Sequence, residues 1–172
     1  MRRLPFYLIM LISLFVVSHV LAQEKPEEKD NRPLYELDDK ELDKKLGVDE
    51  KAETLKDYIC VIGFHRIPAC SSCELMSKYV YETVTERFAD GVKDKKIVLR
   101  YRDYEDEKNA DLVKKLGIRS PSLVVLQFKG GKPAKAKMAA TIWALAAEKE
   151  KFMDQVEEDI KWYLSDFEEE QE

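Results

Sequence analysis

The central part of the chain switches between short apolar runs and longer amphipathic stretches. Residues 58–64 form a mostly apolar run rich in β-branched side chains, typical of a strand that is buried on both faces. From Ser71 to Phe88, apolar residues recur at spacings of three and four, which predicts a helix that ends near residues 90–91. Pro68 lies between these two segments and favours a loop there. The pattern therefore predicts a strand, a loop and an amphipathic helix in that order.

The rest of the chain adds elements of both kinds. Further strands are expected at 97–104, 122–128 and 132–139, and further helical segments at 108–116, 142–147 and 152–167. Gly117 stops the first of these helices, and the Gly130-Gly131 turn favours a hairpin. A strand–helix–strand unit favours parallel pairing with a right-handed crossover. The expected fold class is therefore α/β, with a mixed central sheet, helices on both faces and a long C-terminal helix.

The first residues have the order of a secretory signal. The basic start Met1-Arg2-Arg3 precedes an apolar run over residues 6–17, and small residues follow up to Ala22. The run is short for a membrane span of roughly 20 residues. We therefore expect cleavage before Gln23 and a periplasmic or extracellular protein. Without cleavage, the segment would anchor the protein to the membrane.

The expected domain organisation follows from these patterns and from local composition. Proline and charged residues dominate after the signal, and such a segment buries too little apolar surface to order itself. The expected parts are a signal peptide at 1–22, a charged linker with a possible short helix at 23–56, one folded domain at 57–167 and an acidic tail at 168–172.

Composition excludes two classes of function. The 172 residues include 29 basic and 34 acidic side chains, a net charge of −5, and loss of Arg2 and Arg3 with the signal makes the mature chain more acidic. Nucleic acid is therefore not an expected partner, because lysine and arginine supply most of that affinity. His19 also leaves with the signal. His65 is then the one histidine of the mature chain, which excludes a site built from several histidines. The composition does not fix the oligomeric state.

The motif Cys70-Ser71-Ser72-Cys73 carries the candidate chemistry. It falls at the first turn of the predicted helix, where two side chains three positions apart come close enough to bridge. Free N–H groups and the positive end of the helix dipole favour a thiolate there. We therefore expect Cys70 to be the nucleophile and Cys73, one turn deeper, to resolve the mixed disulfide. Ser71 and Ser72 are small and polar and leave Cys70 accessible to a substrate.

Three other interpretations of the motif stay open. The two cysteines could form a permanent structural disulfide, or be a relict in a domain that only binds. They could also hold a metal together with Cys60 and His65, since sets of three cysteines and one histidine bind zinc. Cys60, however, lies inside an apolar strand run, where packing in the core is favoured. The dithiol interpretation calls for no cofactor and no metal.

The order of elements and the place of the C-x-x-C motif resemble the thioredoxin-like superfamily. The segment Gly117-Ile118-Arg119-Ser120-Pro121-Ser122, which leads into an apolar strand, is also similar to the family, and so is the Gly130-Gly131 turn. Pro121 matches the family's cis-proline, which lies beside the active cysteines. The preceding residue, here Ser120, supplies backbone hydrogen bonds to bound peptide in the family. The resemblance implies a thioredoxin-like fold from about Asp57 to the C-terminus, with Ser120 and Pro121 in substrate binding.

A closer resemblance is to a small group of bacterial secreted thioredoxin-fold proteins. It rests on Phe64-His65 ahead of the C-x-x-C motif, on Trp143 and on the long final helix. The chain departs from thioredoxin itself, which has Trp where Ala69 stands and a buried acid about where Gly63 falls. The proton that the buried acid accepts in thioredoxin would here be accepted by a water, by His65 or by Glu74.

The expected function is an exported thiol–disulfide oxidoreductase with Cys70, Cys73 and His65 as its catalytic residues. Its partners would be protein or small-molecule disulfides and thiols, with a membrane reductase of the disulfide-relay type as electron donor. The alternatives are a non-catalytic binding module of the same fold with a structural disulfide, and a metal-handling protein.

Overall fold

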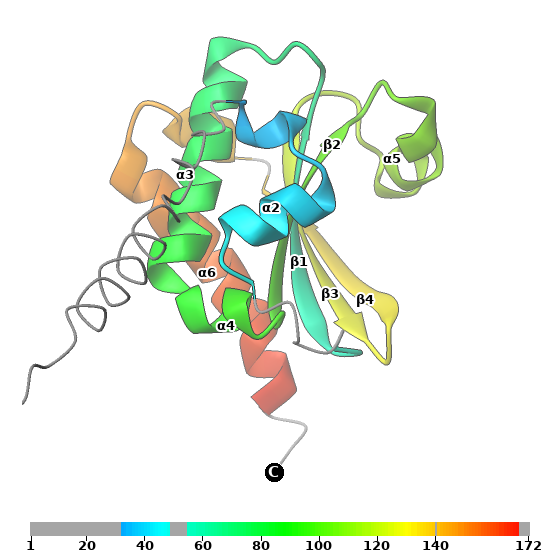
Figure 1. The fold of residues 1–172 in the computed structure, drawn as a ribbon, viewed down its shortest axis with the longest axis vertical. Coiled ribbons are helices and arrows are strands. Elements are labelled where there is room, and N and C mark those ends of the chain that lie inside the picture. Colours follow the sequence, from blue (N-terminus) through cyan, green and yellow to red (C-terminus); the bar gives the residue numbers. More distant parts are fainter. Residues whose placement is uncertain (1–31, 49–54, 140, 169–172) are drawn as a thin grey trace, which may run out of the picture. The chain divides into compact units, whose positions relative to one another are not determined.

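A computed structural model describes residues 32–48, 55–139 and 141–168, which all belong to one compact unit, Arg32–Glu172. Its centre is a four-stranded sheet with the strand order β2-β1-β3-β4 (Figure 1). β1 (Tyr58–His65) pairs in parallel with β2 (Ile97–Asp103) and antiparallel with β3 (Ser122–Lys129). β4 (Lys132–Met138) pairs antiparallel with β3 across the Gly130-Gly131 turn. The predicted mixed sheet is confirmed.

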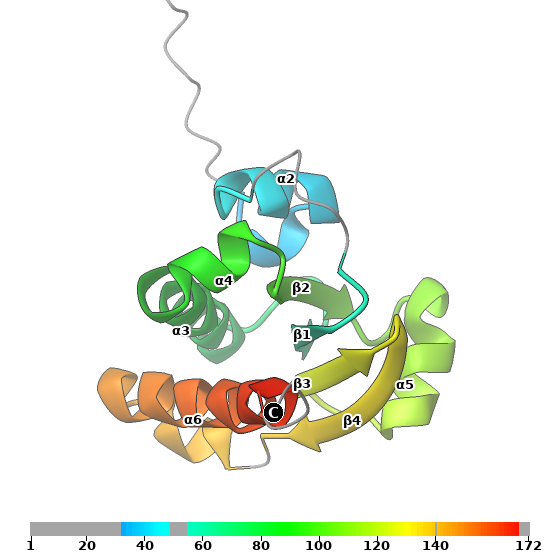
Figure 2. The same ribbon diagram turned by 90° about the horizontal axis from the view of Figure 1, so that it is seen from below.

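Helices cover both faces of this sheet. Figure 2 shows α3 (Ser71–Arg87) and α6 (Lys149–Glu168) on one side and α5 (Ala110–Leu116) on the other. α5 ends at Gly117, whose φ of 68° is in the left-handed region that glycine adopts without strain. The architecture is thus a thioredoxin-like α/β fold with a long C-terminal helix, as the sequence predicted.

The remaining elements are short. α4 (Ala89–Lys93) follows α3 after a break at Phe88, where the sequence pattern predicted one continuous helix. Single 3-10 turns occur at η2 (Glu107–Asn109) and η3 (Ile142–Leu145). No helix within the described ranges has the length and the apolar character needed to cross a membrane.

β1 is apolar from Ile59 to Phe64, where both of its faces are covered. Ile59 and Val61 pack with α3 and α6 in the larger core, whereas Cys60, Ile62 and Phe64 pack in a second core with α5. Successive side chains of a strand point to opposite faces, so odd and even positions of β1 serve different cores. His65 lies on the odd face, toward α3.

The segment 32–48, here called the N-terminal strap, belongs to the folded unit. It contains η1 (Leu34–Glu36) and α2 (Asp39–Lys45), and its side chains Tyr35, Leu37 and Leu42 are buried in the larger core. The expected domain boundary at residue 57 is therefore wrong for this part. Its few apolar residues are enough to order the segment, because they pack against a core that the rest of the domain supplies. The remainder of the expected linker, at 23–31 and 49–54, the expected signal and residues 169–172 lie outside the described residues.

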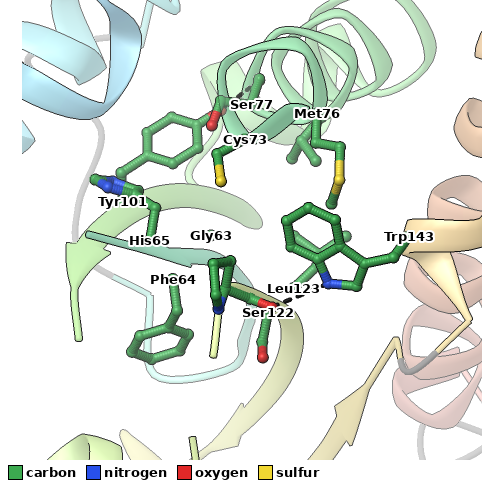
Figure 3. A pocket seen from close by; sticks show the side chains of 12 residues that line it. Gly63, Phe64, His65, Cys73, Met76, Ser77, Tyr101, Ser122, Leu123 and Trp143 are labelled. Atoms are coloured by element: carbon green, nitrogen blue, oxygen red, sulfur yellow. Dashed lines mark hydrogen bonds between the residues drawn. The ribbon is translucent and has the colours of Figure 1, made fainter. Parts of the chain in front are cut away.

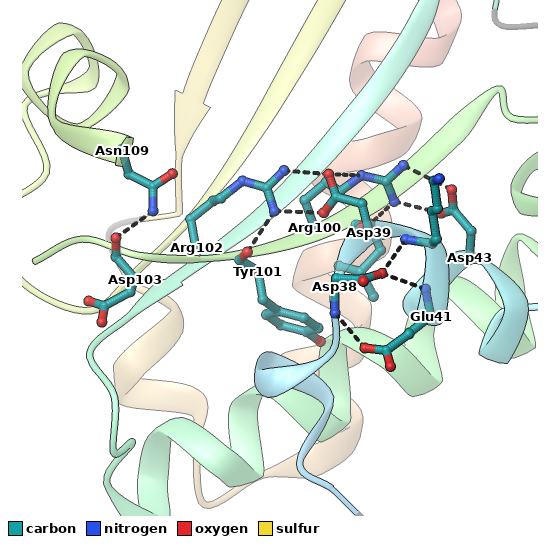
Figure 4. Close-up of polar contacts among 11 residues, drawn as sticks. Asp38, Asp39, Glu41, Asp43, Arg100, Tyr101, Arg102, Asp103 and Asn109 are labelled. Carbon is teal, nitrogen blue, oxygen red and sulfur yellow. Dashed lines mark hydrogen bonds and ion pairs between the residues drawn. The ribbon is translucent and has the colours of Figure 1, made fainter. Parts of the chain in front are cut away.

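Paired charges fix α2 against the edge strand β2 (Figure 4). The Arg102 guanidinium donates to both oxygens of Asp39 at 2.7 and 2.8 Å, and the Arg100 guanidinium donates to both oxygens of Asp43 at 2.6 and 3.1 Å. Such two-point contacts fix orientation as well as distance. A capping box between Asp38 and Glu41 starts the helix. The strap is thus held by both its apolar and its charged residues.

Candidate redox site

The C-x-x-C motif forms the first turn of α3, and its two cysteines are joined as a disulfide. Cys70 is the N-cap residue, and the backbone N–H of Cys73 donates to its Sγ at 3.3 Å. The Cα atoms of the two cysteines are 5.1 Å apart, within the ordinary range for a disulfide. The predicted pairing of Cys70 with Cys73 at a helix start is confirmed.

The two sulfurs differ in access. Cys70 is exposed, and so are Ser71 and Ser72, whereas Cys73 is 4% exposed. A substrate can therefore reach Cys70 but not Cys73 from solvent. The helix places the first cysteine at the surface and turns the second toward the core, because position three of the turn faces the sheet.

A small cavity of about 20 Å³ lies below Cys73 (Figure 3). This is room for roughly one water molecule. Its lining comes from β1, α3, β2, the start of β3 and η3, and includes His65, Cys73, Tyr101, Pro121 and Trp143. The tertiary fold thus brings two of the predicted site residues, His65 and Pro121, to the buried cysteine.

Tyr101 occupies the space above Gly63, about where the resemblance to thioredoxin led us to look for an acid. A Cβ atom on Gly63 would lie 2.8 Å from Cδ1 of Tyr101. The hydroxyl donates to the carbonyl of Ser77 at 2.6 Å, and burial raises the pKa of Tyr101, so it stays protonated. Sequence reasoning missed this residue. The parallel pairing of β1 with β2 would have pointed to it, because this register sets Gly63 directly opposite Tyr101.

His65 is buried between two tyrosine rings. Its ring centroid lies 4.8 Å from that of Tyr35 and 6.2 Å from that of Tyr101. Nδ1 lies 3.3 Å from the Arg66 carbonyl, and Nε2 has no hydrogen-bond partner among the described residues. Burial lowers the pKa of His65, which keeps the ring neutral at pH 7. Proton handling by His65 stays a prediction.

The turn before β3 places Pro121 at the cavity and Ser120 at the surface. The indole Nε1 of Trp143 donates to the Pro121 carbonyl at 2.9 Å, and the Ser122 hydroxyl donates to the Ser120 carbonyl at 2.8 Å. The expectation of a cis bond at Pro121 is wrong. Within the described ranges the one cis peptide bond is Ile67–Pro68. The trans form is the more stable form for most X–Pro bonds.

Cys60 lies on the opposite face of β1 from His65 and Cys73. It packs with α5 in the second core, 7% exposed and unpaired, and burial raises its pKa to about 12. It therefore cannot join the other two cysteines and His65 in one ligand set. No cluster of three or more potential ligands occurs in the described part of the chain. The geometry contradicts the metal interpretation that relied on Cys60.

Comparisons with known proteins found similarity among solved structures only. No family model matches the chain, and no curated protein matches it. Among solved structures, a mutant thioredoxin from Halobacterium salinarum NRC-1 is similar at 17% sequence identity. The alignment covers 72% of this chain and 83% of that chain, with a TM-score of 0.37.

The strap adds a contact to the motif that the sequence did not predict. Glu74 follows Cys73 directly in the sequence, and the Tyr35 hydroxyl donates to Oε1 of Glu74 at 2.9 Å. Burial, followed by the hydrogen bond and the charge of Glu74, raises the pKa of Tyr35 to about 12. Tyr35 stood in the expected linker, where nothing local marks it as a neighbour of the motif. A residue 39 positions away is brought to Glu74 by tertiary packing alone.

Proposed function

We propose that the protein is an exported thiol–disulfide oxidoreductase that works through Cys70 and Cys73. The observation that carries the proposal is the disulfide at the first turn of α3, with one exposed and one buried cysteine. A structural disulfide gains nothing from an accessible sulfur. A redox pair needs one, because exchange requires a thiolate to approach in line with the sulfur that it attacks.

The reaction is a two-step exchange. The Cys70 thiolate attacks one sulfur of a substrate disulfide, which forms a mixed disulfide and releases the first substrate thiol. The Cys73 thiolate then attacks Cys70 Sγ and releases the second thiol. The substrate gains two electrons and two protons, and the protein pair becomes the disulfide. A dithiol reductant, for which a membrane disulfide-relay reductase is the proposed class, returns the pair to the reduced state.

The surface around the motif supports a protein or small-molecule disulfide as substrate. Ile67 and Leu75, at 52% and 39% exposure, flank the motif in sequence and are among the four large apolar side chains that are exposed in the described residues. Ser71, Ser72 and Ser120 are exposed as well and offer hydroxyl and backbone hydrogen bonds. Ser120 and Pro121 keep the substrate-binding role that the resemblance implies.

Thiol titration and insulin reduction test the proposal. Thiols titrated after unfolding should number three when the Cys70–Cys73 pair is reduced and one, that of Cys60, when it is oxidised, and Cys70→Ser should lose insulin reduction. Cys73→Ser should accumulate mixed disulfides on Cys70, because the resolving thiol is gone. Cys60→Ala is the matched control and should retain activity, since Cys60 lies in the other core.

A pair that resists reduction by glutathione, with a potential below about −300 mV, would contradict the proposal. That result would favour the binding module with a structural disulfide.

Export is proposed from the N-terminal sequence. A periplasmic or extracellular fraction should contain a mature protein whose mass begins at Gln23. An intact Met1 in the membrane fraction would instead indicate an anchored protein.

A further inference from the structure

Glu74 is the acidic residue nearest to the motif on α3. It follows Cys73 directly and lies four positions after Cys70, and residues at this spacing share one face of a helix. Its backbone N–H donates to the Cys70 carbonyl at 2.9 Å, so the residue is fixed one turn beyond the exposed cysteine. A carboxylate in this place acts on a Cys70 thiolate as a like charge.

The carboxylate of Glu74 is held by a residue that cannot swing away. Tyr35 is 7% exposed, its ring packs against His65, and its hydroxyl donates to Oε1 of Glu74. The strap that carries Tyr35 is itself fixed to β2 through Asp39 and Arg102. A surface glutamate would ordinarily sample many rotamers, but this one is positioned by the core.

The charged groups around Glu74 that are named below do not compensate the negative charge of its carboxylate. On the strap, Glu36 adds a second negative charge close to Tyr35. On β1, His65 is kept neutral by its lowered pKa. Lys78, one turn along α3, pairs with Glu82 at 3.9 Å, and Arg66 in the loop before the motif pairs with Glu105 at 3.4 Å.

We propose that Glu74, held by Tyr35, is a positioning residue that sets the redox balance of the dithiol. The proposal rests on the proposed function. By repelling a Cys70 thiolate, the Glu74 carboxylate disfavours the reduced pair relative to the disulfide. The protein is thereby made a better reductant than its helix N-terminus alone would make it. The N-terminal strap takes part in the redox site through this one hydrogen bond.

The test is the equilibrium of the full chain with reduced and oxidised glutathione, measured at several pH values. An equilibrium is preferable to a rate, because surface charge changes how fast charged glutathione approaches. Glu74→Gln should raise the ratio of reduced to oxidised protein roughly two- to fivefold at pH 8, the size expected for one like charge at this range. Tyr35→Phe should shift the ratio in the same direction by less, because a freed carboxylate moves into water.

Two matched controls separate charge and position from general effects. Glu86→Gln removes an exposed carboxylate from α3 three turns further on, beyond the screening length of about 10 Å at 0.1 M salt, and should not move the ratio. Tyr81→Phe removes the other tyrosine hydroxyl that links α3 to the strap, through the Lys45 carbonyl at 3.1 Å, and should not move it either.

The pH profile distinguishes a charge effect from a structural one. The Glu74→Gln shift should fade at low pH, where Cys70 is a thiol in the reduced state and no like charge is left to repel. A shift of equal size at every pH, or no shift beyond that of Glu86→Gln, overturns this inference while leaving the proposed function intact. A wild-type pair that never equilibrates with glutathione overturns both.

Discussion

The contact between Gly63 and Tyr101 predicts that even a methyl group at position 63 destabilises the protein. In Gly63→Ala, the new Cβ would lie 2.8 Å from Cδ1 and 2.9 Å from Cε1 of Tyr101. Carbon atoms pack at about 3.5–4.0 Å, so the strand or the ring must shift by roughly 0.7 Å. Tyr101 has little room to move, because it is 6% exposed and its hydroxyl is bonded to the Ser77 carbonyl.

The magnitude follows from two opposing effects. Overpacking of a filled core costs about 1–3 kcal/mol. Replacing glycine by alanine within a strand returns about 0.5–1 kcal/mol, because the unfolded chain loses freedom. The free energy of unfolding of Gly63→Ala should therefore fall by about 1–2 kcal/mol, measured by urea unfolding of the oxidised protein. The same contact leaves no room for an acidic side chain at position 63.

Two further variants test the cause. Gly91→Ala is the control, because its Cβ meets the flexible end of Ile97 at 3.1 Å, and the change should be neutral or slightly stabilising. Tyr101→Val removes the δ and ε carbons, so adding Gly63→Ala to it should cost much less than in the wild type. If Gly63→Ala unfolds like the wild type, or costs the same in both backgrounds, the steric argument is refuted.

Three other predictions concern His65, Trp143 and Asp39. Because burial lowers the pKa of His65, the unfolded chain takes up a proton near pH 6.5 before the folded protein does; stability should fall from pH 7 to pH 5 by at most about 1.4 kcal/mol per pH unit, and His65→Phe should flatten that slope in urea unfolding. Trp143→Phe removes the donor to the Pro121 carbonyl and should lower the free energy of unfolding by about 1 kcal/mol, an expectation that unchanged urea midpoints would contradict. Burial alone would raise the pKa of Asp39, but the hydrogen bond and charge of Arg102 and the charge of Arg100 bring it below its usual value. The stability that Asp39 adds is therefore present above pH 4 and lost as the pH falls through the lowered pKa, so the difference from Asp39→Asn, about 0.5–1 kcal/mol for so exposed a pair, should shrink between pH 7 and pH 3 in the same assay.

The sequence by itself determined the elements and the place of the dithiol. β1, α3 and the β3–β4 hairpin lie where the apolar periodicity and the Gly130-Gly131 turn predicted them, because these signals depend on neighbours a few positions apart. The same local logic predicted the disulfide between Cys70 and Cys73, since a helix start brings residues three apart together. Strand alternation also predicts that Cys60 and His65 point to opposite faces of the sheet, because they lie at even and odd positions of one strand.

The surroundings of the dithiol were decided only by the tertiary structure. Tyr101 fills the space over Gly63 because the parallel register of two strands sets them opposite each other, 38 positions apart in the chain. Tyr35 reaches Glu74 although its own segment is so charged that composition indicated a linker. A few apolar side chains order such a segment once a core exists to receive them, and no local pattern reports that core. Local periodicity thus located the two cysteines, whereas long-range packing chose the side chains that surround them.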